Sequence, residues 1–418
     1  MDSDKYVSNI KCDEQIFALS FHPVHDVIAT GHIDGSIEIW KYNILHGAIK
    51  SSNSSNISNN TRVLHNKTGF KTSCRDLKFS NDGEMLYAVS SDRSMIGINT
   101  NGSIAFNIPE AHNASINKMI LLNRSNSNNN GSDKVMIATG DDIGLIKIWD
   151  IRTNKACYTF HKHEDYICDM TYNEDKQTLL TVGGDAALCA YDLRKPNSKD
   201  ACIRSEDQEG ELCCVSVAKG GRKVICGTQE GTILLFHWDD WEDCSDRFLG
   251  HPETVECFHS IDESTMLSGS SDGIIRVLSI LPNKILGVLG DHGSNSVEGM
   301  CSSRDSCILG SYGLDHVVRF WDLSVFQGNS SDNNDGNDDD DDDDNDSDEG
   351  IQMDTKGEMN EDDDDEEDGK VVSRWNEDEE LSSDSDMDDD DDDDDTKGGT
   401  SMKRNAFPSK AETFFSDL

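Results

Sequence analysis

Histidine, aspartate and hydroxyl side chains, the types used in acid–base and nucleophilic catalysis, recur along this chain at fixed spacing. A hydroxyl residue lies ten positions before an aromatic or apolar residue at Thr30, Thr139, Thr181, Ser268 and Ser311. An aspartate lies six positions before such a residue at Asp34, Asp92, Asp185, Asp272 and Asp315. A histidine precedes four of these units, at His112, His163, His251 and His292. An active site occurs once in a chain, so we interpret these recurring residues as structural groups, buried and paired by hydrogen bonds.

Other patterns that suggest an enzyme are weaker. The stretch Gly269–Gly273 matches G-x-S-x-G, but that nucleophile motif needs a strand-to-helix turn in an α/β sheet, and the sister repeats lack it. Phosphate-binding motifs of the GxGxxG or P-loop type are absent from the sequence. His22, His25 and the pair His161 and His163 lack consistent metal-ligand companions. We therefore expect no catalytic activity, no cofactor and no metal site.

The repeat that carries these residues has the period of a propeller blade. Its anchor residues are Trp40, Ile98, Trp149, Tyr191, Phe236, Leu278 and Trp321, separated by 58, 51, 42, 45, 42 and 43 residues. A period near 42 to 45 is typical of WD repeats, each of which forms one four-stranded blade. The two long intervals contain the Ser/Asn-rich tracts 51–60 and 123–133, which predict loop insertions on the surface.

Within a unit the pattern predicts strands. Apolar and polar residues alternate in SIEIW (36–40) and LIKIW (145–149), and Asp-Gly turns precede strands at 34–35 and 272–273. After Trp321 too few residues remain to complete the last blade, and the segment Tyr6–Cys12 can supply its outer strand. The sequence therefore predicts an all-β fold, a seven-bladed WD-repeat propeller over residues 1–327 that closes into a ring without an open edge.

In WD-repeat proteins, Asp, His, Ser or Thr, and Trp side chains form a hydrogen-bonded tetrad within a blade. Two sets fit this pattern best. One is His112, Thr139 and Trp149, with Asp142 one place off the expected position. The other is His292, Ser311, Asp315 and Trp321.

Charge is concentrated in the C-terminal part of the chain. The 418 residues contain 37 Lys and Arg against 82 Asp and Glu, a net charge of −45. Residues 329–398 hold 36 of the acidic and 4 of the basic residues, a net −32, so the rest of the chain is only mildly acidic. An acidic molecule is repelled by phosphate backbones, so direct nucleic-acid binding is not expected.

Neither a membrane location nor secretion is expected. No apolar run approaches 18 residues, and the first residues lack the basic and apolar regions of a secretory signal. The 13 cysteines are odd in number and show no zinc-like CxxC pairs, and Cys168, Cys189, Cys226 and Cys257 lie in strand-like runs. We expect these cysteines to be small buried hydrophobic residues in a reducing compartment.

The segment 328–400 is predicted to be a disordered acidic tail, because its aspartate runs repel one another. Two interpretations stand: a solubilising appendage, or a segment that holds basic partners such as ribosomal proteins or histones. Candidate sites for acidophilic kinases are Ser347, Ser382, Ser383 and Ser385. In the basic and aromatic segment 401–418, Phe414 and Phe415 either dock into a groove of a partner or fold back onto the propeller.

Several stretches go beyond the shared repeat pattern. They are ALSFHP (18–23), ATGDDIGLIKIWDIR (138–152), HEDYICDM (163–170) and SILPNKILG (279–287). In this order they resemble the WD repeat-containing protein 55 family over residues 10–326. The resemblance implies a monomeric, non-catalytic scaffold in the nucleus, chiefly the nucleolus, with the cytoplasm as a second location. It also implies a role in ribosomal RNA production and ribosome biogenesis, with pre-ribosomal assembly factors as partners.

A second resemblance concerns the end of the third repeat. Asp142, Trp149, Asp150 and Arg152 match the WDxR ending of WD-repeat proteins that dock on the DDB-type adaptor of cullin-RING ubiquitin ligases, and Arg194 in AYDLR matches it partly. An arginine just past the strand should project from the propeller rim, where its fork can meet a carboxylate. The alternatives to a scaffold are therefore a substrate receptor of such a ligase and, as a third class, a histone chaperone.

Overall fold

The computed structural model describes residues 5–46, 60–67, 69–99, 101–123, 135–198 and 200–327. The chain divides into two units, Met1–Asn337 and Asp338–Leu418, and every described residue belongs to the first. The predicted acidic tail and the C-terminal segment, and most of the two predicted loop insertions, lie outside the described residues. No helix among the described residues has the length and apolarity that a membrane crossing requires.

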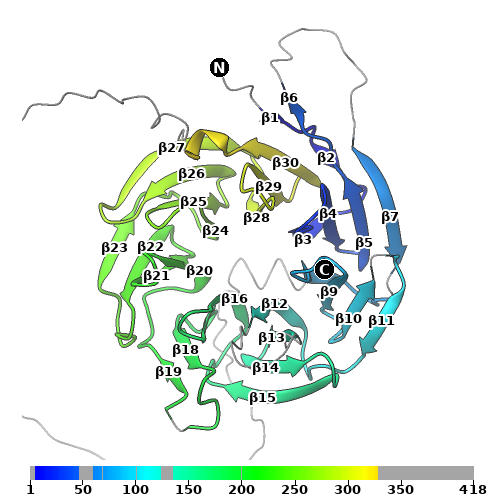
Figure 1. Cartoon of the computed structure of the whole chain (residues 1–418). Helices are drawn as coiled ribbons and strands as arrows, with labels where there is room; N and C mark the ends of the chain where they lie inside the picture. The colour runs from blue at the N-terminus through cyan, green and yellow to red at the C-terminus, as the bar shows by residue number, and fades with distance from the viewer. Residues whose placement is uncertain are drawn as a thin grey trace, which may run out of the picture. The chain divides into compact units, whose positions relative to one another are not determined.

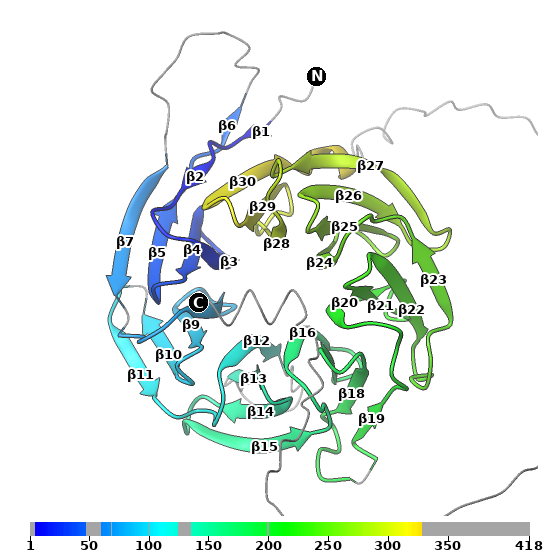
Figure 2. The same cartoon turned by 180° about the vertical axis from the view of Figure 1, so that it is seen from behind.

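The described residues form seven four-stranded antiparallel sheets arranged in a ring around a central axis (Figures 1 and 2). In each sheet one edge strand faces the axis and the opposite edge strand lies at the rim. The only helical element among these residues is the short 3₁₀ helix η1 (Ser324–Phe326). The predicted all-β, seven-bladed propeller is confirmed.

The strands of each blade follow in chain order from the axis to the rim. Blade 1 has β3 (Ile16–Phe21), β4 (Val27–His32), β5 (Ser36–Lys41) and β7 (Thr61–Lys67). Blade 2 has β8 (Cys74–Phe79), β9 (Met85–Ser90), β10 (Met95–Asn99) and β11 (Ile104–Ile108). Blade 3 has β12 (Ile116–Asn123), β13 (Val135–Asp141), β14 (Leu145–Asp150) and β15 (Lys155–His161). Blade 4 has β16 (Ile167–Asn173), β17 (Thr178–Gly183), β18 (Leu188–Asp192) and β19 (Cys202–Arg204).

The remaining blades repeat this order, except that the last one borrows its rim strand. Blade 5 has β20 (Leu212–Ala218), β21 (Lys223–Thr228), β22 (Thr232–His237) and β23 (Asp246–Leu249). Blade 6 has β24 (Val255–Ser260), β25 (Thr265–Ser270), β26 (Ile274–Ser279) and β27 (Lys284–Asp291). Blade 7 has β28 (Val297–Ser302), β29 (Ile308–Gly313), β30 (Val317–Asp322) and, from the start of the chain, β2 (Ile10–Lys11).

The hydrophobic core lies between neighbouring blades. The second strand of a blade is buried along its whole length in β17, β21 and β29. One cluster, for example, joins Ile146 of blade 3 to Ile167 and Tyr191 of blade 4, and all three side chains are fully buried. Both faces of a blade are therefore covered, which explains why its inner strands carry near-continuous apolar runs.

The predicted Asp-Gly turns are present and require glycine. Gly35 and Gly273 have φ angles of 78° and 82°, in the left-handed region that other residues avoid. A Cβ atom on Gly273 would lie 2.5 Å from the backbone oxygen of Gly293. These turns therefore fix where the second strand of a blade ends and the third begins.

The start of the chain closes the ring, as the sequence predicts. In β2, Ile10 pairs with Val318 and Lys11 with Val317 of β30, and the Cys12 amide donates to the His316 carbonyl at 2.9 Å. Ile10 is 2% exposed and packs in a cluster with Val318. The open edge of blade 7 is thereby covered.

The closing strand is shorter than the segment Tyr6–Cys12 that the sequence suggests. The amide of Phe320 donates to the Asn9 side-chain oxygen at 3.3 Å, so a side chain replaces the backbone partner and the ladder ends at Ile10. Tyr6 belongs instead to β1 (Lys5–Tyr6), which pairs with β6 (Leu45–His46) in a separate two-stranded sheet.

Candidate interaction site

Blade 3 contains a complete hydrogen-bonded tetrad. The indole N–H of Trp149 donates to Thr139 Oγ1 at 2.8 Å, and His112 Nε2 lies 2.7 Å from the same oxygen. His112 Nδ1 lies 2.7 Å from Asp141 Oδ2. The acid of this tetrad is therefore Asp141 rather than Asp142, because Asp141 ends β13 inside the blade and Asp142 is the first residue of the exposed turn.

Blade 7 contains the second predicted tetrad. Trp321 Nε1 donates to Ser311 Oγ at 2.8 Å, His292 Nε2 lies 2.7 Å from that oxygen, and His292 Nδ1 lies 3.1 Å from Asp315 Oδ2. Burial raises the pKa of Asp315, but its hydrogen bond to His292, the charge of His292 and the hydrogen bond from Arg319 outweigh burial and hold this pKa below the usual range. The four residues chosen from the sequence thus meet as predicted.

The other recurring histidines form partial networks. In blade 4, His163 lies 2.8 Å from both Thr181 and Asp185, and Tyr191 stands where blades 3 and 7 have tryptophan. In blade 6, His251 Nε2 lies 2.8 Å from Ser268 Oγ. These residues bond to one another inside blades, which supports the interpretation that their recurrence is structural.

Blade 6 differs because its aspartate is bonded to an arginine and not to the histidine. Arg276 donates to Asp272 Oδ2 at 2.6 Å, and His251 Nδ1 is buried without a hydrogen-bond partner among the described residues. His251 is 7% exposed. Burial first, and then the positive charge of Arg276, lower the pKa of His251 to about 4.

We expect His251 to make the propeller less stable in acid. The unfolded chain binds a proton as pH falls below about 6.5, whereas the folded blade keeps His251 neutral until pH is near 4. The free energy of unfolding should therefore fall between these two pH values, with roughly 2 kcal/mol lost from this residue at pH 5. Urea unfolding at pH 7.5 and pH 5 should show a smaller acid loss for His251→Gln than for the wild type. Equal losses in the two proteins would contradict this assignment.

Two arginines of the WDxR type occupy matching places on blades 3 and 4. Arg152 donates to both carboxylate oxygens of Asp150, at 3.0 and 2.7 Å, and Arg194 does the same to Asp192, at 2.8 and 2.8 Å. The two arginine side chains are 50% and 58% exposed. The hydrogen bonds from Arg194, against a smaller opposing effect of burial, lower the pKa of Asp192. Each guanidinium is thus oriented by its own strand end and accessible at the surface.

The remaining candidates of this motif do not form one exposed group with Arg152. Trp149 is 5% exposed and serves the tetrad, and Asp150, 9% exposed, holds Arg152. Asp142 is exposed and accepts from Asn117 at 2.7 Å. It precedes β14, whereas Arg152 follows it, so the two lie at opposite ends of a six-residue strand, on the order of 20 Å apart. Phe414, Phe415, Ser347, Ser382, Ser383 and Ser385 lie outside the described residues.

The strands nearest the axis carry charged side chains that the sequence analysis missed. Lys118 of β12 lies 3.7 Å from Asp169 of β16. Burial, and then the negative charge of Glu298 on β28, raise the pKa of Glu256 on β24 to about 8. Glu298 itself has a raised pKa because of burial. The sequence signal that could have revealed these side chains was a charged residue within an otherwise apolar first strand of a blade.

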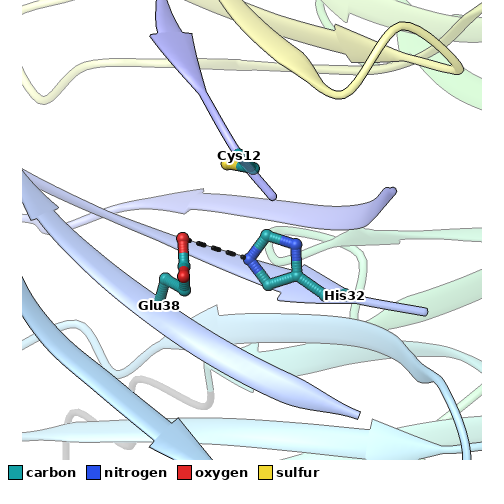
Figure 3. Close-up of side chains that lie close together, drawn as sticks. All are labelled: Cys12, His32 and Glu38. Atoms are coloured by element: carbon teal, nitrogen blue, oxygen red, sulfur yellow. Dashed lines mark ion pairs between the residues drawn. The ribbon is translucent and has the colours of Figure 1, made fainter. Parts of the chain in front are cut away.

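All 13 cysteines are free thiols. Cys189 and Cys226 are buried as expected, whereas Cys168 and Cys257 are half-buried. One group of donor atoms in the described part of the chain is compact enough to hold a metal ion: those of Cys12, His32 and Glu38 (Figure 3). The sequence analysis missed this group, because Cys12 precedes the first repeat unit. The available signal was the position of Cys12. It lies four residues before β3, just as His112 lies four residues before β12.

A comparison with protein families decides where this propeller belongs. The model described as WDR55 matches residues 7–326, which run from just before β2 to the end of η1. This chain belongs to the WDR55 family. The family resemblance expected from the sequence is therefore confirmed.

Relatives in the WDR55 family include proteins of animals and plants. "WD repeat-containing protein 55" of Bos taurus is 37% identical over 307 residues, 73% of this chain and 74% of the bovine protein. The Homo sapiens protein of that name is 34% identical over the same share of this chain and 74% of its own length. The one of Arabidopsis thaliana is 34% identical over 321 residues, 76% of this chain and 83% of the plant protein.

Membership of the WDR55 family and the propeller fold together support a protein-interaction scaffold. WD-repeat propellers generally bind other proteins through their loops and rims and are typically non-catalytic. In this member, the exposed arginines Arg152 and Arg194 and the exposed turn at Asp142 are the surface features that the sequence had singled out.

Proposed function

We propose that this WDR55-family chain is a non-catalytic scaffold of the nucleolus that brings pre-ribosomal assembly factors together during ribosomal RNA production and processing. The observation that carries the proposal is the family match across the whole closed ring, residues 7–326. It is supported by the use of the recurring His, Asp and Ser or Thr side chains within blades, which leaves the molecule a rigid framework of loops and strand edges.

The charge of the chain favours basic partners within this function. A net charge of −45 attracts cationic proteins and repels bare phosphate backbones. Basic ribosomal proteins and assembly factors are therefore the partners that we propose for the acidic segment 329–398, which lies outside the described residues. Affinity purification of the full-length protein from cells tests the function, and recovery of pre-ribosomal proteins is the expected result.

A second function is favoured by one specific observation, the Asp–Arg fork in the turn between the third and the rim strand of both blade 3 and blade 4. Arg152 and Arg194 are each pre-oriented by a carboxylate and each about half exposed. Such a fork can bind a carboxylate on the DDB-type adaptor of a cullin-RING ubiquitin ligase. The chain would then act as a substrate receptor.

This second function predicts a large effect of one substitution. Arg152→Ala should weaken binding of the purified adaptor at least about fivefold, because arginine is enriched among the interface residues whose truncation costs more than about 1 kcal/mol. The matched control is Arg247→Ala. Arg247 lies on β23 of blade 5, is 45% exposed and is paired with Glu209. The measurement is the affinity of the wild type and of each variant for the immobilised adaptor. Equal affinity of all three, or no binding by the wild type, removes the ligase function.

A further inference from the structure

Blade 1 has different donor atoms at the positions that form the histidine–aspartate network in blades 3 and 7. Cys12 lies four residues before β3, where His112 lies four residues before β12. His32 lies at the end of β4, as Asp141 lies at the end of β13. The two positions that meet in blade 3 therefore bring a thiol and an imidazole together in blade 1.

A carboxylate completes this group. Ligand atoms of Cys12, His32 and Glu38 all lie within 4.8 Å of one another, and His32 Nε2 is 3.7 Å from Glu38 Oε2. The three residues are 3%, 1% and 2% exposed. They come from the segment after β2, from β4 and from β5, and Figure 3 shows them close together. One sulfur, one nitrogen and one oxygen donor thus converge inside the protein.

Neighbouring groups orient two of these side chains. His32 Nδ1 faces the backbone oxygen of Glu14 at 3.4 Å, which leaves Nε2 directed toward the group. Arg62 donates to Glu38 Oε1 at 2.7 Å and so fixes the carboxylate with Oε2 toward His32. The hydroxyl of Thr30 lies 2.9 Å from His32 Nε2. A backbone carbonyl behind a histidine and a hydrogen bond on a carboxylate are the supports that metal ligands have in proteins.

We propose that Cys12, His32 and Glu38 bind one zinc ion, with the Thr30 hydroxyl or a water molecule in the fourth position. Zinc prefers four ligands drawn from thiolate, imidazole and carboxylate, at about 2.0–2.3 Å. A tetrahedron of that size places ligand atoms about 3.3–3.8 Å apart, so the side chains need to move inward by only about 1 Å. On binding, the Cys12 thiol loses its proton to solvent and the S–Zn bond forms. A thiolate and a carboxylate then offset the two charges of Zn²⁺. The guanidinium of Arg62, which also bonds to Glu38, is 42% exposed, so solvent screens its charge.

The position of the site gives it a structural role. Cys12 follows the strand that completes blade 7 and its amide bonds to His316 of that blade, whereas His32 and Glu38 belong to blade 1. A metal ion at this point links the first and last blades at the seam of the ring. This inference is independent of the function in ribosome biogenesis.

The test uses the full-length protein, freed of metal with a chelator under reducing conditions and then titrated with Co²⁺ as a spectroscopic substitute for zinc. We expect one equivalent of tetrahedral cobalt with a sulfur-to-cobalt charge-transfer band, displaced by one equivalent of Zn²⁺. The band should disappear in Cys12→Ser and persist in Cys157→Ser, which removes an exposed cysteine of blade 3. Cobalt bound by aspartates elsewhere in the chain gives no sulfur band.

A second variant keeps the test decisive if Cys12→Ser does not fold. Arg62, whose side chain is 42% exposed, orients Glu38 without being a ligand, and Arg62→Gln should weaken cobalt and zinc binding about 10- to 100-fold. The proposal is overturned if the wild type shows no sulfur-to-cobalt band, if the band survives in a folded Cys12→Ser protein, or if Arg62→Gln binds metal as tightly as the wild type. Each of these results would mean that the group is only an internal hydrogen-bonded set.

Discussion

Replacement of His112 by alanine should lower the free energy of unfolding of the propeller by about 3–5 kcal/mol. The ring bridges Asp141 and Thr139 at 2.7 Å each, and all three residues are at most 1% exposed. Burial lowers the pKa of His112 more than its bond to Asp141 raises it, so the neutral ring donates a hydrogen bond to a carboxylate. The variant loses both bonds and leaves a buried carboxylate oxygen without this donor, a cost of about 1–3 kcal/mol or more for each group.

The matched control is His161→Ala. His161 lies at the end of β15 in the same blade, is exposed, and makes one hydrogen bond, to the Ile143 carbonyl at 3.1 Å. Its loss should change the free energy of unfolding by no more than about 0.5–1 kcal/mol. Urea unfolding followed by tryptophan fluorescence measures both variants. A His112→Ala protein as stable as His161→Ala would show that the tetrad does not hold blade 3 together.

The strand that closes the ring should be the second site of large effect. Ile10→Ala should cost about 2–5 kcal/mol, the range for truncating a buried isoleucine. Ile10 is 2% exposed and packs with Val318 and Ile308 of blade 7. Because β2 has two residues, this side chain supplies much of the packing that keeps the first segment on the last blade.

Lys11→Ala provides the comparison for this prediction, because it changes the adjacent residue of the same strand. Lys11 is exposed, and its pairing with Val317 uses backbone atoms that alanine retains. We expect a change of at most about 0.5 kcal/mol for Lys11→Ala. Amide hydrogen exchange of β30 should accelerate in Ile10→Ala and not in Lys11→Ala. If the two variants exchange alike, the closing strand does not secure blade 7.

The number of blades and the closing segment could be predicted because they rest on local pattern. Anchor spacing sets the number of units, and alternation with Asp-Gly turns sets the strands within each one. Details that depend on where a strand ends could not be predicted. Asp141 and Asp142 are adjacent, and only the end of β13 at Asp141 decides which of them bonds to His112.

Contacts between distant segments were also beyond the sequence. Asp272 and Asp315 occupy the same repeat position, and each has an arginine four residues later, Arg276 and Arg319. Even so, Asp315 still bonds to its histidine and Asp272 does not. The meeting of the donor atoms of Cys12 and His32 could not be predicted either. They meet because the ring closes and not because of any spacing within one repeat.

Quantitative affinity purification of the full-length protein from cells tests the central claim most directly. The comparison includes a form without residues 329–398 and the Arg152→Ala variant, each at equal bait recovery. The account predicts that pre-ribosomal proteins dominate the wild-type sample, fall when 329–398 is removed, and are unchanged by Arg152→Ala. A sample that contains ubiquitin-ligase subunits in place of pre-ribosomal proteins, and that loses them with Arg152→Ala, would contradict it.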